Sequence, residues 1–360
     1  MTRARHVREI DDLDDRALLE VEGLKTHFRT RNGVVRSVDG VSFDLERGRT
    51  LAIVGESGSG KTVLSRSIMG LLPPHNVVRE GRVRFGDVDM TSASEAELRG
   101  LWGAQVSMVF QDPMTSLNPV VRIGRQITES LRYHLAMSRQ DAKQTAISLL
   151  RSVGIPEPEH RMRWYPHQFS GGMCQRIVIA AAIACGPKLL LADEPTTGLD
   201  VTVSAQILDL IHRLQQERYM SVILITHDLG VVTGRSDEVI VMYAGQIVEQ
   251  APTSVLFRDM RMPYTEALLK SAPRLSNPSH TRLHTIPGNP PNPADLPKGC
   301  RFAPRCPYVQ ERCREEEPPL RAADVPRHWY ACWYPVGSPE GTRALQENQA
   351  VGAPGAVGVV

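Results

Sequence analysis

The fold is decided by Gly55-Glu56-Ser57-Gly58-Ser59-Gly60-Lys61-Thr62, a stretch that fits the phosphate-binding pattern G-x-x-x-x-G-K-[ST]. Its glycines allow the backbone to approach a phosphate closely, so that successive N–H groups point toward it. The apolar run before it, residues 50–54, predicts a buried strand, and the residues after it predict a helix whose N-terminal dipole favours an anion. In such a loop Lys61 reaches the β- and γ-phosphates, and Thr62 holds Mg²⁺. The sequence therefore predicts a triphosphate-binding loop between a strand and a helix.

Two carboxylates follow a second apolar strand. In Leu189-Leu190-Leu191-Ala192-Asp193-Glu194 the acids close the run, and such a strand end is expected beside the phosphate loop. Asp193 suits the Mg²⁺ shell, and Glu194 suits a general base that polarises the attacking water. A third apolar strand, residues 222–226, ends in His227. A single histidine is more often structural, but this position favours contact with the γ-phosphate.

Strand-like and helix-like stretches alternate along the central chain, which predicts an α/β fold with a parallel sheet. Residues 18–54 predict short strands with a hairpin turn at Arg31-Asn32-Gly33. Residues 112–169 are more polar, and the four-residue spacing of their apolar side chains predicts an inserted set of helices. Seven prolines fall between residues 273 and 297, a segment in which we do not expect regular structure. The tail at residues 336–360, rich in glycine and alanine, is expected to be disordered.

The composition excludes several classes of protein. The chain has 360 residues, of which 41% are hydrophobic and 23% charged, and this size predicts two or three domains. A net charge of +2 gives no general electrostatic affinity for nucleic acid. The longest apolar run, residues 177–185, is far shorter than the roughly 20 residues that span a bilayer. Residues 1–16 lack the apolar core of a secretory signal, so a cytosolic chain without disulfides is expected.

Four of the six cysteines cluster late in the chain, at Cys300, Cys306, Cys313 and Cys332. Four thiolates suit a tetrahedral Zn²⁺ ion or an iron–sulfur cluster. Structural zinc sites usually contain closely spaced C-x₂₋₄-C pairs, and this group of cysteines contains none. The wider spacing and the Cys306-Pro307 pair favour a cluster, while zinc and free or oxidised thiols stay open as alternatives.

A further glycine-rich stretch, Phe169-Ser170-Gly171-Gly172-Met173-Cys174-Gln175-Arg176, opens a helix in which Ser170 suits the N-cap. Together with the phosphate loop, it resembles the signature sequence of ATP-binding-cassette (ABC) ATPases. Other elements of that family are present too: Gln111 resembles the Q-loop, Thr197-Gly198-Leu199-Asp200 the D-loop, and His227 the switch histidine. Phe28 falls where the family places an aromatic side chain that stacks on adenine.

The resemblance implies an α/β P-loop NTPase fold of the ABC type. Such a fold has a RecA-like parallel-sheet core, an antiparallel β subdomain and an inserted helical subdomain, and here a small Cys-rich C-terminal domain would follow. The expected boundaries are a tail at 1–17, an ATPase domain at 18–260 with the helical insert at about 112–169, a C-terminal domain at 261–335 and a disordered tail at 336–360. The resemblance implies that ATP is bound by Phe28, Gly55, Glu56, Ser57, Gly58, Ser59, Gly60, Lys61, Thr62, Gln111, Asp193, Ser170, Gly172 and Asp200. It implies Glu194, His227 and Gln111 as catalytic residues, and Thr62, Gln111 and Asp193 as Mg²⁺ ligands.

Three stretches resemble, more narrowly, the ATPases of oligopeptide and dipeptide (peptide/nickel) importers. They are Val109-Phe110-Gln111-Asp112-Pro113-Met114-Thr115-Ser116-Leu117-Asn118-Pro119, then Pro263-Tyr264-Thr265 with Leu268 and Leu269, and Gly299-Cys300-Arg301-Phe302-Ala303-Pro304-Arg305-Cys306-Pro307. This family's C-terminal extension is associated with a [4Fe-4S] cluster, which implies Cys300, Cys306, Cys313 and Cys332 as its ligands. Three positions depart from the family pattern: Met262 stands where histidine is common, Phe169 where leucine is usual, and Cys174 at a variable position. None of the three is an inferred phosphate contact.

The resemblance also implies partners. Two such ATPases sandwich two ATP molecules head to tail, with Ser170 and Gly172 of one chain on the γ-phosphate held by the other. The second ATP-binding subunit is commonly a paralogue, so a heterodimer is expected. The full complex would add two transmembrane permease subunits and an extracytoplasmic solute-binding protein, with this chain peripheral on the cytoplasmic face of the cell membrane and no nucleic-acid partner. The sequence leaves the cargo open among dipeptides, oligopeptides and nickel chelates.

Two other classes compete with an importer ATPase. A soluble ABC-type ATPase acting on nucleic acid or ribosomes would show a long coiled-coil insertion or two tandem cassettes, and this sequence shows neither. A regulatory module that holds ATP without turnover would not require both Glu194 and His227, and both are present. We therefore expect an ATPase that powers the import of di-/oligopeptides or related solutes.

Overall fold

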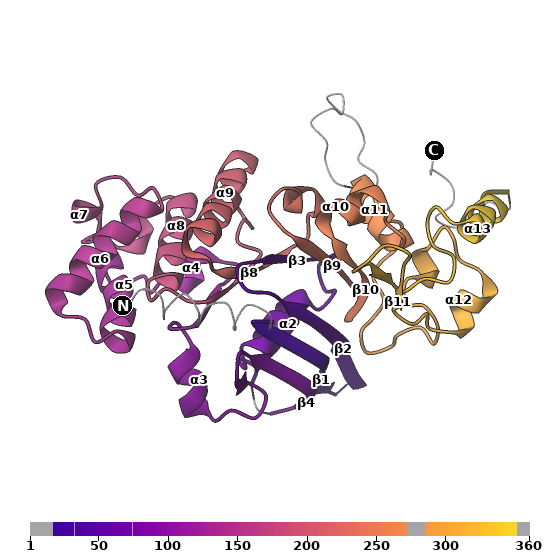
Figure 1. Ribbon diagram of the computed structural model, residues 1–360, viewed down its shortest axis with the longest axis horizontal. Coiled ribbons are helices and arrows are strands. Elements are labelled where there is room, and N and C mark those ends of the chain that lie inside the picture. The colour runs from indigo at the N-terminus through magenta and orange to yellow at the C-terminus, as the bar shows by residue number, and fades with distance from the viewer. Residues whose placement is uncertain (1–16, 32, 74, 272–284, 351–360) are drawn as a thin grey trace, which may run out of the picture. The chain divides into compact units, whose positions relative to one another are not determined.

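The computed structural model describes residues 17–31, 33–73, 75–271 and 285–350 (Figure 1). These residues form two compact units, and each unit is built from three separate stretches of chain. Within the described ranges, unit 1 contains residues 17–21, 43–50 and 82–225, and unit 2 contains residues 22–42, 51–81 and 226–350.

Unit 1 is organised around parallel strands in the order β8-β7-β6. Their bounds are β6 (Val106–Val109), β7 (Leu189–Asp193) and β8 (Ser221–Thr226). Every residue of the three strands is buried, as expected for parallel strands covered on both faces. The register pairs Asp193 with Ile225, so the carboxyl ends of β7 and β8 lie at one edge. The predicted α/β fold with parallel strands is confirmed.

The helices of unit 1 are α3 (Glu95–Leu101), α4 (Pro113–Ser116), α5 (Ile123–His134), α6 (Arg139–Ser152), α7 (Pro158–Arg161), the 3-10 turn η1 (Pro166–Gln168), α8 (Gly171–Ala182) and α9 (Val201–Arg218). Helices α5 to α8 gather in one group, seen at the left of Figure 1. Helix α5 buries Ile123, Ile127 and Leu131 at four-residue spacing. The next residue in that series, Leu135, is 43% exposed because the helix ends at His134.

Unit 2 contains the strand order β11-β12-β10-β9-β3. The strands are β3 (Thr50–Val54), β9 (Glu238–Tyr243), β10 (Gln246–Pro252), β11 (Arg321–Ala322) and β12 (Trp329–Tyr330), and only the β3–β9 pair among them is parallel. The helices are α2 (Lys61–Ile68), η2 (Leu229–Val232), α10 (Thr253–Arg258), α11 (Pro263–Ser271), η3 (Ala303–Arg305), α12 (Glu311–Glu315) and α13 (Pro339–Ala350). The late strands β11 and β12 thus extend the sheet that begins with β3, the strand before the phosphate loop.

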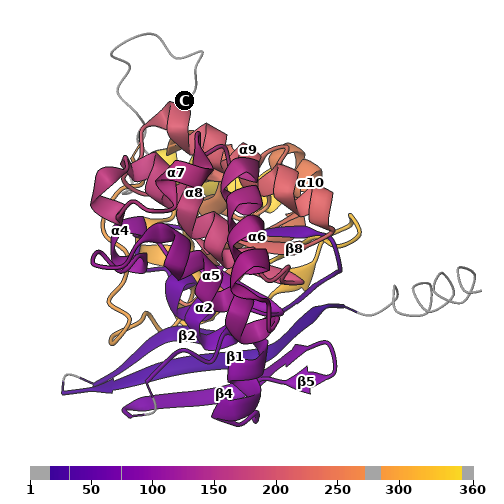
Figure 2. The same ribbon diagram turned by 90° about the vertical axis from the view of Figure 1, so that its left-hand side faces the viewer.

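A second sheet has the order β2-β1-β4-β5, with β1 (Leu19–Thr30), β2 (Gly33–Leu45), β4 (Val77–Phe85) and β5 (Val88–Asp89) side by side in Figure 2. The expectation of short strands over residues 18–54 is wrong, because β1 and β2 span 12 and 13 residues. Buried and exposed side chains alternate over residues 41–45 of β2, so one face of the strand is covered in its second half, whereas none of its first five residues is buried. The predicted turn includes Asn32, which lies outside the described residues.

The C-terminal tail differs from the sequence expectation. Helix α13 forms within the segment that was expected to be disordered, and Ala344 and Asn348 on it are buried. The amide of Asn348 donates to the carbonyls of Pro307 and Val309, so packing decides this segment rather than its composition. Residues 351–360, residues 1–16 of the expected N-terminal tail and residues 272–284 of the proline-rich segment lie outside the described residues. Among the helices that the structure describes, none has the length and apolar character needed to cross a membrane.

Candidate nucleotide-binding and hydrolysis site

The phosphate loop connects the fully buried strand β3 to helix α2. Gly60 precedes the helix at φ +104°, a conformation that L side chains rarely adopt, and a Cβ there would lie 2.1 Å from the carbonyl oxygen of Ser37. A Cβ on Gly55 would lie 2.2 Å from the carbonyl oxygen of Met242. Neighbouring backbone carbonyls therefore require glycine at both positions, a reason that adds to the close approach to phosphate expected from the sequence pattern.

Lys61 is buried, and its ammonium group lies inside the curve of the loop. Its Nζ donates to the carbonyl oxygens of Gly55 at 2.7 Å and Glu56 at 2.9 Å, and to Oγ of Ser59 at 3.3 Å. The loop thus carries a cation at its centre and a helix N-terminus at its end, which together suit the β- and γ-phosphates of a nucleotide. Thr62 is the next residue of α2.

Two residues that the sequence analysis did not assign to the site hold this loop. The backbone N–H of Glu56 donates to the hydroxyl of Tyr264 at 2.8 Å. The carboxylate of Glu56 accepts two hydrogen bonds from the guanidinium of Arg305. Tyr264 and Arg305 come from motifs that the sequence analysis linked only to the C-terminal region. They lie more than 200 positions from Glu56 in the chain, so no local pattern could predict their contacts with it.

The expected general base lies in unit 1, directly after β7. Glu194 has φ +46°, and its N–H donates to the carbonyl of Ile225 at 2.9 Å. Its Oε2 accepts from Nε2 of Gln111 at 3.1 Å and from Oγ1 of Thr197 at 2.9 Å. Asp193, the last residue of β7, is 1% exposed. The structure thus brings Gln111 and Glu194 together and adds the Thr197 hydroxyl, while the catalytic roles expected for Gln111 and Glu194 stay predictions.

The signature stretch also lies in unit 1. Ser170 is the N-cap of α8, and its Oγ accepts from the N–H of Met173 at 3.4 Å. A Cβ on Gly172 would lie 2.7 Å from Cγ1 of Val203 in α9, so the start of α9 packs against the signature glycine. Asp200 caps α9 by accepting from the N–H of Val203 at 2.9 Å. Ser170 is exposed at the N-terminus of its helix, where an anion is favoured.

Phe28 and His227 belong to unit 2 with the phosphate loop. Phe28 is half-buried on β1, and His227 is exposed immediately after β8. The roles of Phe28 at adenine and His227 at the γ-phosphate stay predictions. The same holds for a shared Mg²⁺ site of Thr62 with Gln111 and Asp193, because these residues come from different units.

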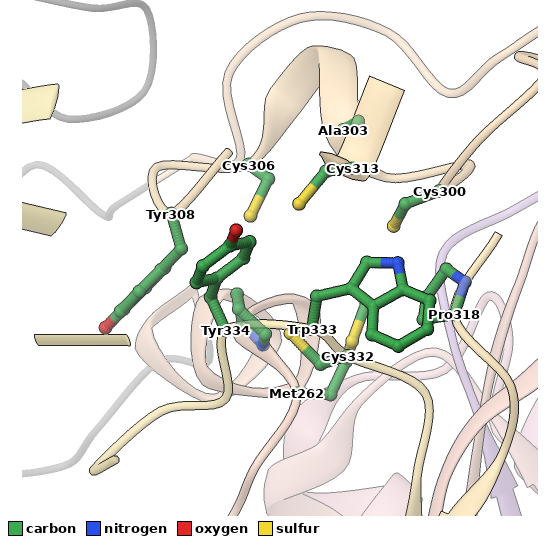
Figure 3. Close-up of a pocket in the computed structure, with 11 residues that line it drawn as sticks. Met262, Cys300, Ala303, Cys306, Tyr308, Cys313, Pro318, Cys332, Trp333 and Tyr334 are labelled. Atoms are coloured by element: carbon green, nitrogen blue, oxygen red, sulfur yellow. The ribbon is translucent and has the colours of Figure 1, made fainter. Parts of the chain in front are cut away.

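The four late cysteines line one pocket, together with Met262, Pro263, Ala303, Tyr308, Pro318, Trp333 and Tyr334. Figure 3 shows the four sulfur atoms directed toward the same space. No disulfide involves any of the four, and burial raises the pKa of Cys300 to about 11 and the pKa of Cys306 well above the usual value. Backbone N–H groups of Phe302 and Tyr308 oppose these rises. Within the described residues, however, no group of three or more His, Cys, Asp or Glu side chains is placed to hold a metal ion.

Comparison with known families places these features in a class. Residues 38–197 match the family described as ABC transporter, and residues 248–313 match the oligopeptide/dipeptide transporter C-terminal region. A solved structure, the dimeric post-hydrolysis state of the ATP-binding cassette MJ0796 bound to ADP and Pi, aligns with a TM-score of 0.59 at 25% identity, over 65% of this chain and 98% of that one. Fold and site together define an ABC transporter ATPase, an ATP-hydrolysing subunit.

Curated relatives narrow the class. The oligopeptide transport ATP-binding protein OppD of Bacillus subtilis (strain 168) is 50% identical over 318 residues, 88% of each chain. The dipeptide transport ATP-binding protein DppD of Escherichia coli (strain K12) is 48% identical over 320 residues, 89% of this chain and 97% of that one. The chain belongs to the family of oligopeptide and dipeptide transport ATP-binding proteins. The family resemblance expected from the sequence is confirmed, and it favours transport over action on nucleic acid or ribosomes.

Proposed function

We propose that this chain hydrolyses ATP to drive the import of dipeptides or oligopeptides through partner permeases. The relatives that it matches over most of their length carry names from peptide transport. The observation that carries the hydrolytic part is the contact of Gln111 and Thr197 with one oxygen of Glu194. Two donors on a single carboxylate oxygen hold the base in one orientation, which a general base requires.

The chain's own residues supply the phosphate-binding and water-activating parts of the reaction. The phosphate loop and Lys61 bind the β- and γ-phosphates, and Thr62, Gln111 and Asp193 would hold Mg²⁺, which neutralises charge on the phosphates when bound. Glu194 accepts a proton from the attacking water as the water oxygen bonds to the γ-phosphorus and the bond to the ADP oxygen breaks. Ser170 and Gly172 would act in trans, on the γ-phosphate held by a second ATPase.

The proposed assembly rests on the resemblance to the ATP-binding subunits of peptide transporters. A second ATP-binding subunit, a paralogue in this proposal, completes the pair of ATP sites. Two transmembrane permease subunits and an extracytoplasmic solute-binding protein complete the importer, with this chain at the cytoplasmic face of the membrane. ATP bridges both halves of the dimer and its products do not, so the closed state is favoured only before hydrolysis.

We also propose that Cys300, Cys306, Cys313 and Cys332 hold a [4Fe-4S] cluster in a C-terminal domain of about residues 261–335, after an ATPase domain of about residues 18–260. Four thiols around one pocket are the donor set that such a cluster takes. A cluster of several irons holds its cysteine sulfurs farther apart than a single ion does.

The transport proposal is tested with the full chain assembled with its permeases in liposomes. Glu194→Gln should abolish ATP hydrolysis and uptake of labelled di- and tripeptides, keep ATP binding, and trap the closed dimer. Uptake of nickel chelate without peptide uptake would redirect the proposal to another cargo. Normal turnover in Glu194→Gln would overturn the base assignment.

The cluster proposal is tested separately on the full chain purified without oxygen. About four irons with matching sulfide, and a broad absorbance near roughly 400 nm, would support it. One zinc without iron, or no metal, would contradict it and leave the ATPase assignment unaffected.

A further inference from the structure

Arg305 connects the cysteine segment to the phosphate loop. It lies next to Cys306, and its Nη1 and Nη2 donate to the two carboxylate oxygens of Glu56 at 2.6 and 2.9 Å. Its Nε donates to the carbonyl of Pro287 at 2.8 Å, and Nη1 also donates to the hydroxyl of Tyr243 at 3.2 Å. This one guanidinium therefore binds both carboxylate oxygens of the second residue of the phosphate-binding pattern.

The environment makes this ion pair strong. The Arg305 side chain is 3% exposed and that of Glu56 is 26% exposed. Burial by itself lowers the pKa of Arg305, but the hydrogen bonds to Glu56 and Tyr243 outweigh it and raise the pKa. Paired, charge-assisted bonds of this kind are geometrically specific and roughly twice as strong as neutral ones. Removing the guanidinium would leave the Glu56 carboxylate partly desolvated without this partner.

Further contacts, from α11 and from residues 300–306, hold the loop and its surroundings. Tyr264, which accepts from the N–H of Glu56, packs with Tyr243 and Phe302 at ring distances of 4.5 and 5.3 Å. Arg301, next to Cys300, donates to the carbonyl of Ala244 at 2.6 Å.

The residue after Ala244 completes the connection. The N–H of Gly245 donates to the carbonyl of Ser59 in the loop at 2.9 Å. Direct and indirect contacts thus run from residues 300–306 to both halves of the phosphate loop.

We infer that Arg305 is a positioning residue for ATP binding, which holds the phosphate loop through Glu56 and makes nucleotide affinity depend on the four-cysteine pocket. A phosphate loop binds through backbone N–H groups that must already point inward, so anchoring Glu56 lowers the ordering cost of binding. Because Arg305 lies between two of the pocket's cysteines along the chain, loss of order in the pocket would release it. The role of Arg305 stands on these contacts alone, whereas the dependence on the pocket rests on the function proposed for the cysteines.

The role of Arg305 is tested by the affinity of the full chain for a non-hydrolysable ATP analogue with Mg²⁺. Arg305→Met should raise the Kd about tenfold or more, as expected from losing charge-assisted bonds. Arg305→Lys should recover part of the loss, because a single ammonium replaces the charge but not the paired geometry. Arg343→Met, which removes an exposed arginine of α13, should leave the Kd unchanged.

Steady-state kinetics of Arg305→Met distinguish a positioning role for Arg305 from a general loss of structure. In the assembled complex Arg305→Met should raise the KM for ATP while kcat at saturating ATP stays within about twofold, and iron content should match the wild type. A Kd within twofold of wild type in folded Arg305→Met would overturn the inference. If Arg305→Met fails to fold, Glu56→Gln provides the same test from the other side of the ion pair.

The dependence on the pocket is tested with Cys332→Ser, because this cysteine lines the pocket but lies outside residues 300–306, the segment that contains Arg305. Its Kd for the analogue should rise about threefold or more, and the increase should largely vanish in the Arg305→Met background. Cys185→Ser, outside the pocket, should have no effect. Equal effects of Cys332→Ser in both backgrounds, or none in either, would overturn the link, while an iron-free wild type would instead contradict the cluster proposal.

Discussion

Nε2 of Gln111 donates a hydrogen bond to Oε2 of Glu194 across 3.1 Å, although the two residues are 83 positions apart in the chain. Gln111 follows β6 and Glu194 follows β7, and these strands are parallel neighbours whose carboxyl ends meet at one edge. This hydrogen bond connects the segment that begins at Gln111 to the side chain proposed as the general base. Movement of that segment is expected to change the hydrogen bonding of Glu194.

Thr197 shares that carboxylate oxygen, and its hydroxyl is predicted to contribute to turnover. Thr197→Val removes one neutral donor to Glu194, which should lower kcat about two- to tenfold. The Kd for ATP should not change, because Thr197 is placed at the base and not at the phosphate loop. Steady-state kinetics of the assembled ATPase measure both quantities, with Thr196→Val as the matched control. Equal kcat values for the two variants would remove Thr197 from the site.

Alanine substitutions at two glycines of the phosphate loop should have different effects, because one causes a steric clash and the other only backbone strain. Gly55→Ala places a Cβ 2.2 Å from the carbonyl oxygen of Met242, whereas Gly58→Ala meets open space but requires φ +81°. Gly55→Ala should abolish ATP binding, because the new Cβ would push neighbouring backbone away. Gly58→Ala should lower the affinity for ATP about tenfold, as expected from roughly 1–2 kcal/mol of strain. Calorimetric titration of each variant with ATP would measure the two affinities. Tighter binding by Gly55→Ala than by Gly58→Ala contradicts this account of the loop.

The Asp39–Arg301 pair should make stability depend on pH. Burial raises the pKa of Asp39, but the hydrogen bond from Arg301 at 2.5 Å and the contact with His27 outweigh it, so the pKa lies below its usual value of 3.8. A lowered folded-state pKa gives stability that is fully present above about pH 4 and is lost as pH falls through the folded value. Asp39→Asn should therefore cost about 3 kcal/mol at pH 7, since it leaves Arg301 buried without this charge.

Denaturant melts of the full chain at several pH values check the sign. The gap between wild type and Asp39→Asn should be constant from pH 7 down to about pH 5 and should narrow below pH 4. Asp44→Asn, at an exposed position of β2, serves as the control. A gap that widens on acidification would show that the pair does not act in this way.

Helix α13 is expected to be held by Asn348. Its Nδ2 donates at 2.9 Å to the carbonyls of Pro307 and Val309, two residues between Cys306 and Cys313. Asn348→Ala leaves those carbonyls without this donor and should cost about 1–2 kcal/mol. Hydrogen exchange across residues 339–350 should then become faster, while Gln346→Ala on the exposed face should leave it unchanged. Protection that is identical in both variants would mean that Asn348 does not anchor the helix.

Local patterns in the sequence were enough to predict the strands and loops of the nucleotide site. Runs such as residues 189–193 and 222–226 are continuous apolar stretches, and they form the buried parallel strands β7 and β8. Composition was a poorer guide to the tail. Polar and small residues suggested disorder, but Ala344 and Asn348 find a surface to pack on, and α13 forms. Composition reflects only the average polarity of a segment, whereas a helix is stabilised when one of its faces packs on a neighbouring surface.

The sequence by itself determined the phosphate loop, the acidic strand end and the signature helix, because each depends on residues within about a dozen positions of one another. Their backbone conformations and caps follow from local sterics and periodicity. Only the tertiary structure decided that Arg305 pairs with Glu56, 249 positions away, and that Tyr264 accepts from the loop's N–H. Such contacts arise when buried charges and donors must find partners in a shared core, a requirement that depends on packing. No spacing in the sequence records it.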